Sequence, residues 1–249
     1  MISVKGVWKH FGDNDVLKGL NLDLEEGETI VIIGQSGCGK SVLLKTIVGL
    51  LIPDEGEIIL DDVSLKNVSK RELYKIRKKI GMVFQSSALF DSLSVWENVG
   101  LGLMEHSNIP RTEVRSIAQT KLELVGLIGV EDKYPAELSG GMKKRVGIAR
   151  AIAMSPKFVF YDEPTTGLDP IIADRINNLI LALQEKLKIT TIAVTHDMTS
   201  AYRIADRIAM LYDGKIIFDG SPEDIQNTDN PYVQQFINGE GDGPISGGV

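Results

Sequence analysis

The sequence predicts an α/β fold with a mostly parallel sheet, an antiparallel β subdomain at the N-terminus and an all-helical insert. Short apolar runs alternate with helical stretches along most of the 249 residues, which is typical of parallel βαβ units. Residues 90–155 carry helical patterns without a convincing strand, whereas residues 1–24 read as two strands around a turn. We therefore expect a core of residues 1–89 and 156–238, a helical subdomain of 90–155 and a flexible tail of 239–249.

The order of the elements follows from local patterns. Two capping boxes, Ser69 to Glu72 and Ser94 to Glu97, each predict the start of a helix. Tyr212-Asp213-Gly214-Lys215 is a hairpin signal, and five glycines among the eleven residues from Gly239 onward predict the mobile tail. Runs rich in β-branched or aromatic residues predict buried strands at 28–33, 80–84, 158–161, 190–194 and 207–211.

Composition narrows the class of protein. The chain is 43% hydrophobic and 24% charged, which is ordinary for a globular protein. No stretch approaches the roughly 18 apolar residues of a membrane-spanning helix. The 27 Lys and Arg residues against 34 Asp and Glu give a net charge of −7, which argues against nucleic acid as the main partner. The single cysteine excludes an internal disulfide, and no signal-peptide pattern opens the chain, so we expect a cytoplasmic setting.

A glycine-rich loop follows the predicted strand 28–33 and precedes a predicted helix over 40–48. Its sequence, Gly34-Gln-Ser-Gly-Cys-Gly-Lys-Ser41, matches the P-loop pattern G-x-x-x-x-G-K-[ST] at every required position. Backbone N–H groups of such a loop surround phosphate oxygens, and the helix N-terminus adds its dipole. Lys40 would face the β and γ phosphates, and the Ser41 hydroxyl could ligate Mg²⁺. The expected nucleotide contacts are Gly34, Ser36, Gly37, Cys38, Gly39, Lys40, Ser41 and Val42.

The strand predicted over 158–161 ends in two acidic residues. Asp162 at the strand end can hold Mg²⁺ through water, as P-loop NTPases require. Glu163 could accept a proton from an attacking water. Taken alone, the pair could be an acidic turn before Pro164, but together with a P-loop it favours nucleotide hydrolysis.

The segment Leu138-Ser139-Gly140-Gly141-Met142, followed by a basic helix, decides among P-loop classes. Here the sequence resembles the ATP-binding-cassette (ABC) ATPase family over residues 2–237. The resemblance implies a RecA-like core, hydrolysis of ATP with Mg²⁺, and a head-to-tail dimer with two ATP molecules at its interface. The residues give a matching argument, because a second helix N-terminus at 139–141 is a second anion site, suited to a nucleotide held by another chain.

The resemblance also assigns roles to single residues. Gln85 matches the glutamine that senses Mg²⁺ and the γ-phosphate, His196 the switch histidine, and Asp169 the D-loop aspartate. Phe11 takes the place of the aromatic residue that stacks on adenine, with packing at an edge strand as the alternative. The expected catalytic residues are thus Glu163, His196 and Gln85; the expected metal ligands are Ser41, Gln85 and Asp162; and the nucleotide contacts gain Phe11, Ser139, Gly140, Gly141 and Asp169.

Within the ABC family, three features resemble the ATPase of the Mla-type phospholipid transport systems: Met142 and the segments 87–99 and 229–236. This resemblance implies a second copy of the chain, an integral membrane permease, an MCE-domain lipid-binding protein and a small STAS-domain protein as partners. The place implied is the cytoplasmic face of the inner membrane, with the chain peripheral. Leu89 and Phe90 would dock the permease, unless they belong to the subdomain core.

Two alternatives stay open. Met142 could be neutral drift in the cassette of an importer for a small solute. A soluble, non-transport ABC ATPase is the other alternative; such proteins resemble two fused cassettes or a cassette split by a coiled coil, and this sequence has neither feature.

Overall fold

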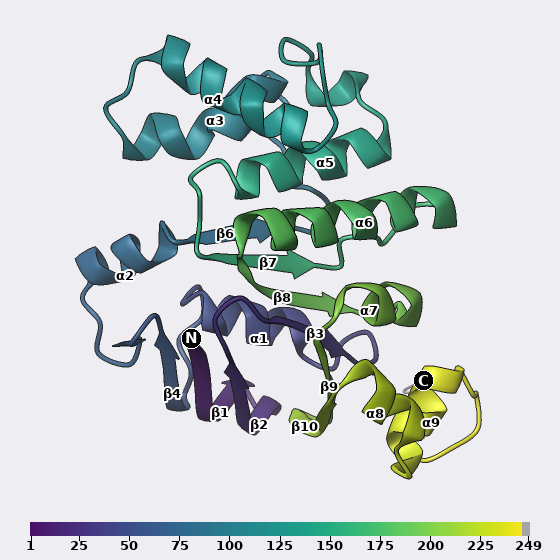
Figure 1. The fold of residues 1–249 in the computed structure, drawn as a ribbon. Helices are drawn as coiled ribbons and strands as arrows, with labels where there is room; N and C mark the ends of the chain where they lie inside the picture. The colour runs from purple at the N-terminus through teal and green to yellow at the C-terminus, as the bar shows by residue number, and fades with distance from the viewer. Residues whose placement is uncertain (246–249) are drawn as a thin grey trace. The chain divides into compact units, whose positions relative to one another are not determined.

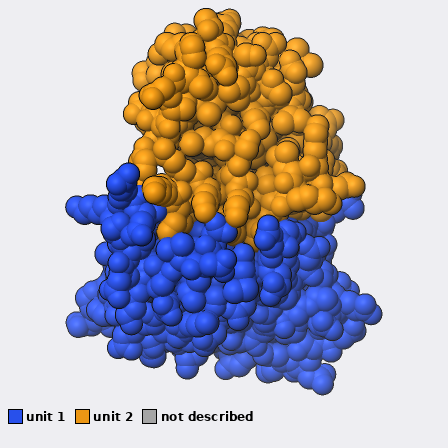
Figure 2. Space-filling model, turned by 60° about the vertical axis from the view of Figure 1, so that its left-hand side comes forward, with its two compact units in different colours: residues 1–73, 192–249 blue, residues 74–191 orange. Residues whose placement is uncertain are grey.

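The computed structural model describes residues 1–245, and the chain divides into two compact units, shown in Figure 2. Unit 1 comprises residues 1–73 together with the chain from residue 192 onward, and unit 2 comprises residues 74–191. Unit 2 combines the helices of residues 90–155 with two strands that the sequence analysis assigned to the core. The domain boundaries at 89/90 and 155/156 therefore stay a prediction.

Strands and helices alternate along the chain, as the ribbon in Figure 1 shows. The strands are β1 (Ile2–Phe11), β2 (Asn14–Leu24), β3 (Thr29–Ile33), β4 (Glu55–Leu60), β5 (Val63–Ser64), β6 (Ile80–Val83), β7 (Phe158–Asp162), β8 (Thr190–Thr195), β9 (Arg207–Tyr212) and β10 (Lys215–Gly220). The helices are α1 (Lys40–Ile47), α2 (Lys70–Arg77), α3 (Val95–His106), α4 (Arg111–Leu124), α5 (Gly140–Ala151), α6 (Pro170–Leu187), α7 (Met198–Ile204), α8 (Pro222–Asn227) and α9 (Pro231–Asn238), with a short 3-10 helix, η1, at Pro135–Glu137.

The N-terminal part of unit 1 is an antiparallel sheet with the strand order β2-β1-β4-β5. The hairpin of β1 and β2 runs from the pair Ile2 and Leu24 to the pair Phe11 and Asn14. Along the end of β2, Leu20, Leu22 and Leu24 are buried and the residues between them are exposed, as expected for a strand with one face on the core. The predicted antiparallel subdomain is confirmed.

The second sheet of unit 1 carries the strand order β10-β9-β3-β8. All five residues of β3 are buried, the pattern of a parallel strand that is covered on both faces. β3 pairs in parallel with β9, from Ile30 opposite Arg207 to Ile33 opposite Met210. β10 then returns antiparallel to β9, which confirms the predicted hairpin. Because β3 leads directly into the glycine-rich loop, its pairing with β9 fixes the point from which that loop starts.

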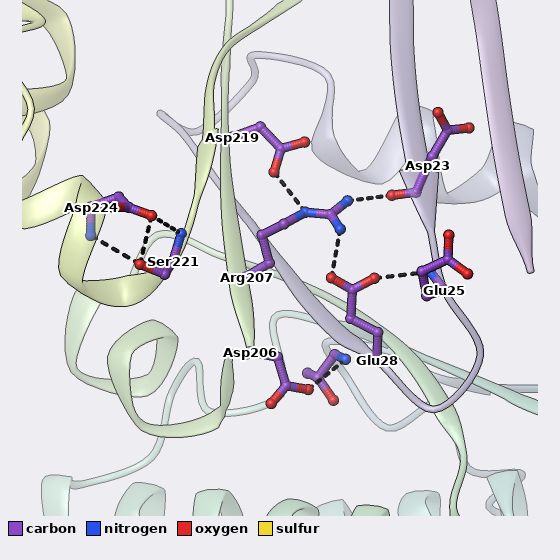
Figure 3. A network of polar contacts seen from close by, with 9 residues as sticks. Asp23, Glu25, Glu28, Asp206, Arg207, Asp219, Ser221 and Asp224 are labelled. Atoms are coloured by element: carbon purple, nitrogen blue, oxygen red, sulfur yellow. Dashed lines mark hydrogen bonds and ion pairs between the residues drawn. The ribbon is translucent and has the colours of Figure 1, made fainter.

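A polar network around Arg207 joins four segments of unit 1 (Figure 3). The guanidinium donates to Glu28 Oε1 at 2.5 Å, to Asp219 Oδ1 at 2.7 Å and to the carbonyl oxygen of Asp23. Close by, the Thr29 N–H donates to Asp206 Oδ2 at 2.9 Å. These bonds fix the beginning of β3 and of β9 to the end of β2 and to β10.

Unit 2 holds the parallel pair β6 and β7 and the packed helices α3, α4, α5 and α6. Residues 90–155, all of them described, contain helices and no strand, as predicted. Glu97 closes the capping box at the start of α3, where its Oε2 accepts bonds from the Ser94 N–H and hydroxyl at 3.0 and 2.8 Å. The Ser69–Glu72 box before α2 is present as well.

The segment after α9 makes contacts that its glycine-rich composition did not suggest. The Ile245 side chain is only 4% exposed, and the Ile245 N–H donates to Gln235 Oε1 at 2.7 Å. Gln235 Nε2 in turn donates to the carbonyl oxygens of Glu240 and Ile245, both at 3.2 Å. A single buried amide thus fastens residues 240–245 to α9; the rest of the predicted tail, 246–249, lies outside the described residues.

Across residues 1–245, no helix combines the length and the apolar character needed to cross a bilayer.

Candidate functional site

The predicted site residues fall in both units, and each group is described within its own unit. In unit 1, the glycine-rich loop leaves the buried end of β3 at Gly34. A Cβ at Gly34 would lie 2.3 Å from the carbonyl oxygen of Leu211 on β9, so only glycine fits there. Gly39, with φ +108°, ends the loop as the N-cap of α1. Glycine supplies both features, the close approach and the left-handed backbone.

Lys40 and Ser41 open α1. The Lys40 side chain is buried, and its Nζ donates to the carbonyl oxygens of Gly34 at 2.7 Å and Gln35 at 3.0 Å. The ammonium group is therefore held against its own loop, and the lysine at this position of a P-loop is the one that reaches the β and γ phosphates. Ser41 and Val42 are half-buried in the first turn of the helix.

A cavity of about 740 Å³ opens beside this loop. Ligand pockets commonly measure about 300–1,000 Å³, so the cavity has the size for a nucleotide. A Cβ at Gly37 would have no atom within 4 Å, so this part of the loop faces open space. The loop therefore leaves room for a ligand that binds through phosphate groups. The lining residues are Gln35, Ser36, Gly37, Cys38, His196, Tyr212, Asp213 and Phe236.

His196 and Phe11 complete the predicted residues of unit 1. His196 is exposed directly after β8 and lines the cavity together with Ser36, Gly37 and Cys38. Phe11 ends β1 with its side chain 48% exposed, and Lys9 Nζ lies 5.5 Å from its ring centroid. An exposed ring face is what stacking on a base requires, but Phe11 is not among the residues that line the cavity.

In unit 2, β7 delivers the two acids side by side. Asp162 is its last residue, and Glu163 follows with φ +51°, a left-handed conformation that is uncommon for a residue other than glycine. Both side chains are largely buried. Glu163 Oε2 accepts a bond from the Thr166 hydroxyl at 3.0 Å. The unusual backbone turns the Glu163 side chain away from the direction that an extended strand would give it.

Gln85 is exposed shortly after β6, and a buried lysine that the sequence analysis did not single out contacts its main chain. Lys144 on α5 donates from Nζ to the Gln85 carbonyl oxygen at 2.6 Å and to the Glu163 carbonyl oxygen at 3.2 Å. Burial lowers the pKa of Lys144, and the nearby carboxylates of Glu163 and Asp162 act in the opposite direction. Lys144 thus links two residues that the sequence predicts to be catalytic.

Ser139, Gly140 and Gly141, which we call the signature loop after the family motif that they resemble, lie at the start of α5. Ser139 is exposed, and its Oγ accepts a bond from the Met142 N–H at 3.3 Å, which leaves the hydroxyl hydrogen for another acceptor. A Cβ at Gly140 would lie 3.7 Å from the Leu168 side chain, so the D-loop packs beside the signature loop. Asp169 caps α6, and its Oδ1 accepts bonds from the N–H groups of Ile171 and Ile172, both at 3.0 Å.

The segment after Gln85 ends in an exposed aromatic residue on an ordered loop. Phe90 is 53% exposed. Asn98, fully buried on α3, accepts a bond from the Phe90 N–H at 2.8 Å and donates to the carbonyl oxygens of Phe90, Leu93 and Ser94 at 3.0 to 3.1 Å. Asn98 is therefore a second residue whose role could not be predicted from the sequence. Its side chain bonds to main-chain groups of the loop, and such bonds leave no motif in the sequence.

Comparison with known proteins identifies the family. A profile described as ABC transporter matches residues 17–166, more than half of the chain. The chain belongs to the ABC transporter family. As an ABC protein with this fold and loop, it is an ATPase, and the predicted resemblance is confirmed.

Two curated relatives and one solved structure are similar to this ABC protein over most of its length. The Haemophilus influenzae intermembrane phospholipid transport system ATP-binding protein MlaF is 43% identical, over 98% of this chain and 93% of the relative. The Mycobacterium leprae probable ribonucleotide transport ATP-binding protein mkl is 41% identical, over 98% and 70%. Among solved structures, the dimeric post-hydrolysis state of the ATP-binding cassette MJ0796, bound to ADP and Pi, is 36% identical with a TM-score of 0.82, over 89% of this chain and 99% of that one.

Proposed function

We propose that this ABC protein is the ATPase subunit of a membrane transporter for phospholipid. The observation that carries the proposal is the relative MlaF, which is named for intermembrane phospholipid transport and is 43% identical over nearly the whole of both chains. Met142 after Ser139-Gly140-Gly141 supports it from the sequence side. The cargo itself would pass through other subunits.

In this proposal the loop residues 34–42 bind the phosphates of ATP. Lys40 supplies the positive charge, and Ser41, Asp162 and Gln85 would hold a magnesium ion. Mg²⁺, when bound, shields the charge on the phosphate oxygens. Phe11 would stack on the adenine ring, and His196 would contact the γ-phosphate. The observations that support these assignments are the cavity beside the loop and the exposure of Phe11 and His196.

Glu163 is the proposed general base. Its left-handed backbone and its bond from Thr166 fix the direction of the carboxylate, and a positioned carboxylate can accept a proton from the attacking water. Gln85 would orient that water and the metal. Because Glu163 takes part in proton transfer rather than in phosphate binding, its loss should reduce turnover much more than affinity for ATP.

The second half of each site would come from another copy of the chain. Ser139 to Gly141 form an exposed helix N-terminus with a free hydroxyl hydrogen, and such a terminus attracts anions. A head-to-tail dimer would place Ser139, Gly140, Gly141 and Asp169 of one copy against the ATP of the other. The dimeric MJ0796 cassette bound to ADP and Pi is a solved example of a relative in such an assembly.

The proposed partners beyond a second copy are an integral membrane permease, an MCE-domain lipid-binding protein and a small STAS-domain protein. The chain would act as a peripheral protein on the cytoplasmic face of the inner membrane, and nucleic acid is not a proposed partner. Phe90, exposed on the loop that Asn98 holds, is the proposed contact for the permease.

A pair of variants tests the shared site. Glu163→Gln keeps the shape and removes the base, so turnover should fall by about 10²- to 10⁴-fold while ATP stays bound. Light scattering with Mg-ATP should then show a shift from monomer to dimer. Adding Ser139→Arg places a cation at the proposed anion site of the other copy and should abolish the shift without preventing ATP binding. A Glu163→Gln chain that binds ATP and stays monomeric would contradict the shared site in the isolated subunit.

The cargo class needs its own test, because the M. leprae relative is named for ribonucleotide transport. The complex purified through a tag on this chain should contain a permease. Mass spectrometry of a lipid extract of this complex should show phospholipid, and the amount of phospholipid per protein should differ between the wild-type and the Glu163→Gln complex. If a second subunit that binds ribonucleotides as cargo copurified in place of a lipid-binding subunit, the result would favour the ribonucleotide alternative.

A further inference from the structure

Lys144 occupies an unusual position for a lysine. It lies on α5, between Lys143 and Arg145, yet its side chain is only 5% exposed while both neighbours are half-buried. Lysine is almost never fully buried unless its ammonium group is paired. In the described part of unit 2, Lys144 Nζ donates to two main-chain oxygens, those of Gln85 and Glu163.

These two oxygens come from distant parts of the chain and belong to the two residues proposed to act on the attacking water. Gln85 precedes Lys144 by 59 positions, and Glu163 follows it by 19. One ammonium group at 2.6 Å and 3.2 Å from the two oxygens therefore ties both main chains to a single point on α5. The spacing between the Gln85 and Glu163 backbones depends on that point.

The backbone at both places needs such support. Glu163 has φ +51°, and in the Gln85 loop Ser87 and Ala88 have φ +63° and +44°. These left-handed conformations cost free energy in residues that carry a Cβ, and surrounding contacts must maintain them. At Glu163 the Thr166 N–H adds a bond to the same carbonyl oxygen at 3.4 Å, so this peptide is held from two sides.

The same face of α5 supports the rest of the Gln85 loop. Arg150 donates from Nη1 to the Ala88 carbonyl oxygen and from Nη2 to the Ser87 carbonyl oxygen, both at 2.6 Å. Gly147 lies between the two cations along the helix, and a Cβ there would be 3.5 Å from Ser87 Cβ. Positions 144, 147 and 150 recur at intervals of three and share one helix face. This face contacts the loop through hydrogen bonds to main-chain carbonyl oxygens at both ends, from Lys144 and Arg150, and through close packing at Gly147 in the middle.

We infer that Lys144 is a positioning residue for ATP hydrolysis, which acts by holding the main chains of Gln85 and Glu163 at a fixed spacing. The inference rests on the proposed roles of these two residues. Lys144 touches neither ATP nor the attacking water in this account. It acts through Glu163 and Gln85, and the nearby negative charges of Asp162 and Glu163 stabilise its ammonium form.

The test compares three variants of the full chain with wild type in a radiolabelled ATPase assay. Lys144→Met, close in length but without charge or donor, should lower kcat by about 10- to 100-fold and leave the dissociation constant for ATP within about twofold, because the phosphate-binding loop lies in unit 1. Lys144→Arg keeps the charge and the donors and should restore kcat to within about fivefold. Lys143→Met, the same change of charge one residue earlier on α5, should stay within about twofold of wild type.

A double variant separates positioning from a loss of folding. If Lys144 acts through Glu163, adding Lys144→Met to Glu163→Gln should not lower the residual turnover further, because effects of residues that act as a unit are not additive. Multiplied losses in the double variant, or a Lys144→Met chain as active as Lys143→Met, would overturn the inference. A fully active Glu163→Gln chain would instead refute the proposed function, so the two failures are distinguishable.

Discussion

The Arg207 network allows a stability prediction that can be worked from the contacts. Arg207→Met removes two ion-pair bonds, to Glu28 and Asp219, and the bond to the Asp23 carbonyl oxygen. The side chains are 26% exposed for Arg207, 17% for Glu28 and 36% for Asp219. Bonds to charged groups contribute about 1.5–3 kcal/mol when buried, and exposed ion pairs contribute about 0–1 kcal/mol.

Because the site is only partly buried, we assign about 0.5–1 kcal/mol to each ion pair and about 1.5 kcal/mol to the carbonyl bond. The expected loss in the free energy of unfolding is therefore about 3 kcal/mol, equivalent to a fall in Tm of about 6 to 12 °C for a chain of this size. Removing the arginine also leaves Glu28 without its cation, so the loss should shrink when Glu28→Gln is present as well.

The assay is urea and thermal unfolding at low and at 0.5 M salt, where the ion-pair part should weaken because salt screens exposed charges. Lys215→Met is the matched control, since it removes one positive charge from the exposed beginning of β10 and should cost less than about 0.5 kcal/mol. The reasoning is refuted if Arg207→Met loses no more stability than Lys215→Met, or if its loss is independent of Glu28.

Three further predictions concern the loop at Phe90, the glycine-rich loop and the start of α3. Phe90→Ala should cost about 1 kcal/mol or less, against about 3–5 kcal/mol for a buried phenylalanine, because the ring is 53% exposed; thermal melting checks this, and a larger loss would place the ring in the core. Maleimide should modify Cys38, which lines the cavity, and block ATP binding, while bound Mg-ATP should protect the thiol and Cys38→Ala should stay active; equal labelling with and without nucleotide would contradict this. The Ser94 N–H, followed by the Ser94 hydroxyl and Arg111, lowers the pKa of Glu97 below its ordinary 4.5, so its contribution to stability is present above pH 4.5 and is lost as the pH falls through the lower folded pKa. The difference in unfolding free energy between wild type and Glu97→Gln, measured by urea unfolding at a series of pH values, should therefore shrink as the pH is lowered below 4.5.

The sequence predicted correctly the parts of the fold that are determined by residues close together in the chain. The glycine-rich loop could be recognised because strand, glycines, lysine and helix occur within fourteen residues, and the capping box at Ser94 because cap and acid are three residues apart. Asp162 and Glu163 could be placed for the same reason, since they directly follow the apolar run 158–161 that predicts a buried strand.

The role of Lys144 could not be predicted in this way. In the sequence, Lys143, Lys144 and Arg145 are three consecutive basic residues, and nothing distinguishes Lys144 from its two neighbours. Its burial depends on carbonyl oxygens 59 residues before it and 19 residues after it, and no local pattern encodes such partners. The segment 240–245 differs from its prediction for a similar reason, because the bonds that hold it come from the amide of Gln235, a side chain that looks like any other polar residue of α9.

Asn98 has a consequence for the kinetics of association. Its four bonds order the main chain of residues 90–94 in the unbound chain. A protein that binds over Phe90 therefore does not have to order this loop. Binding to a surface that is already ordered avoids the entropic cost of immobilisation. An Asn98→Ala chain should therefore bind the proposed permease more slowly through the lost pre-organisation, even though Asn98 itself is fully buried and would not touch the partner.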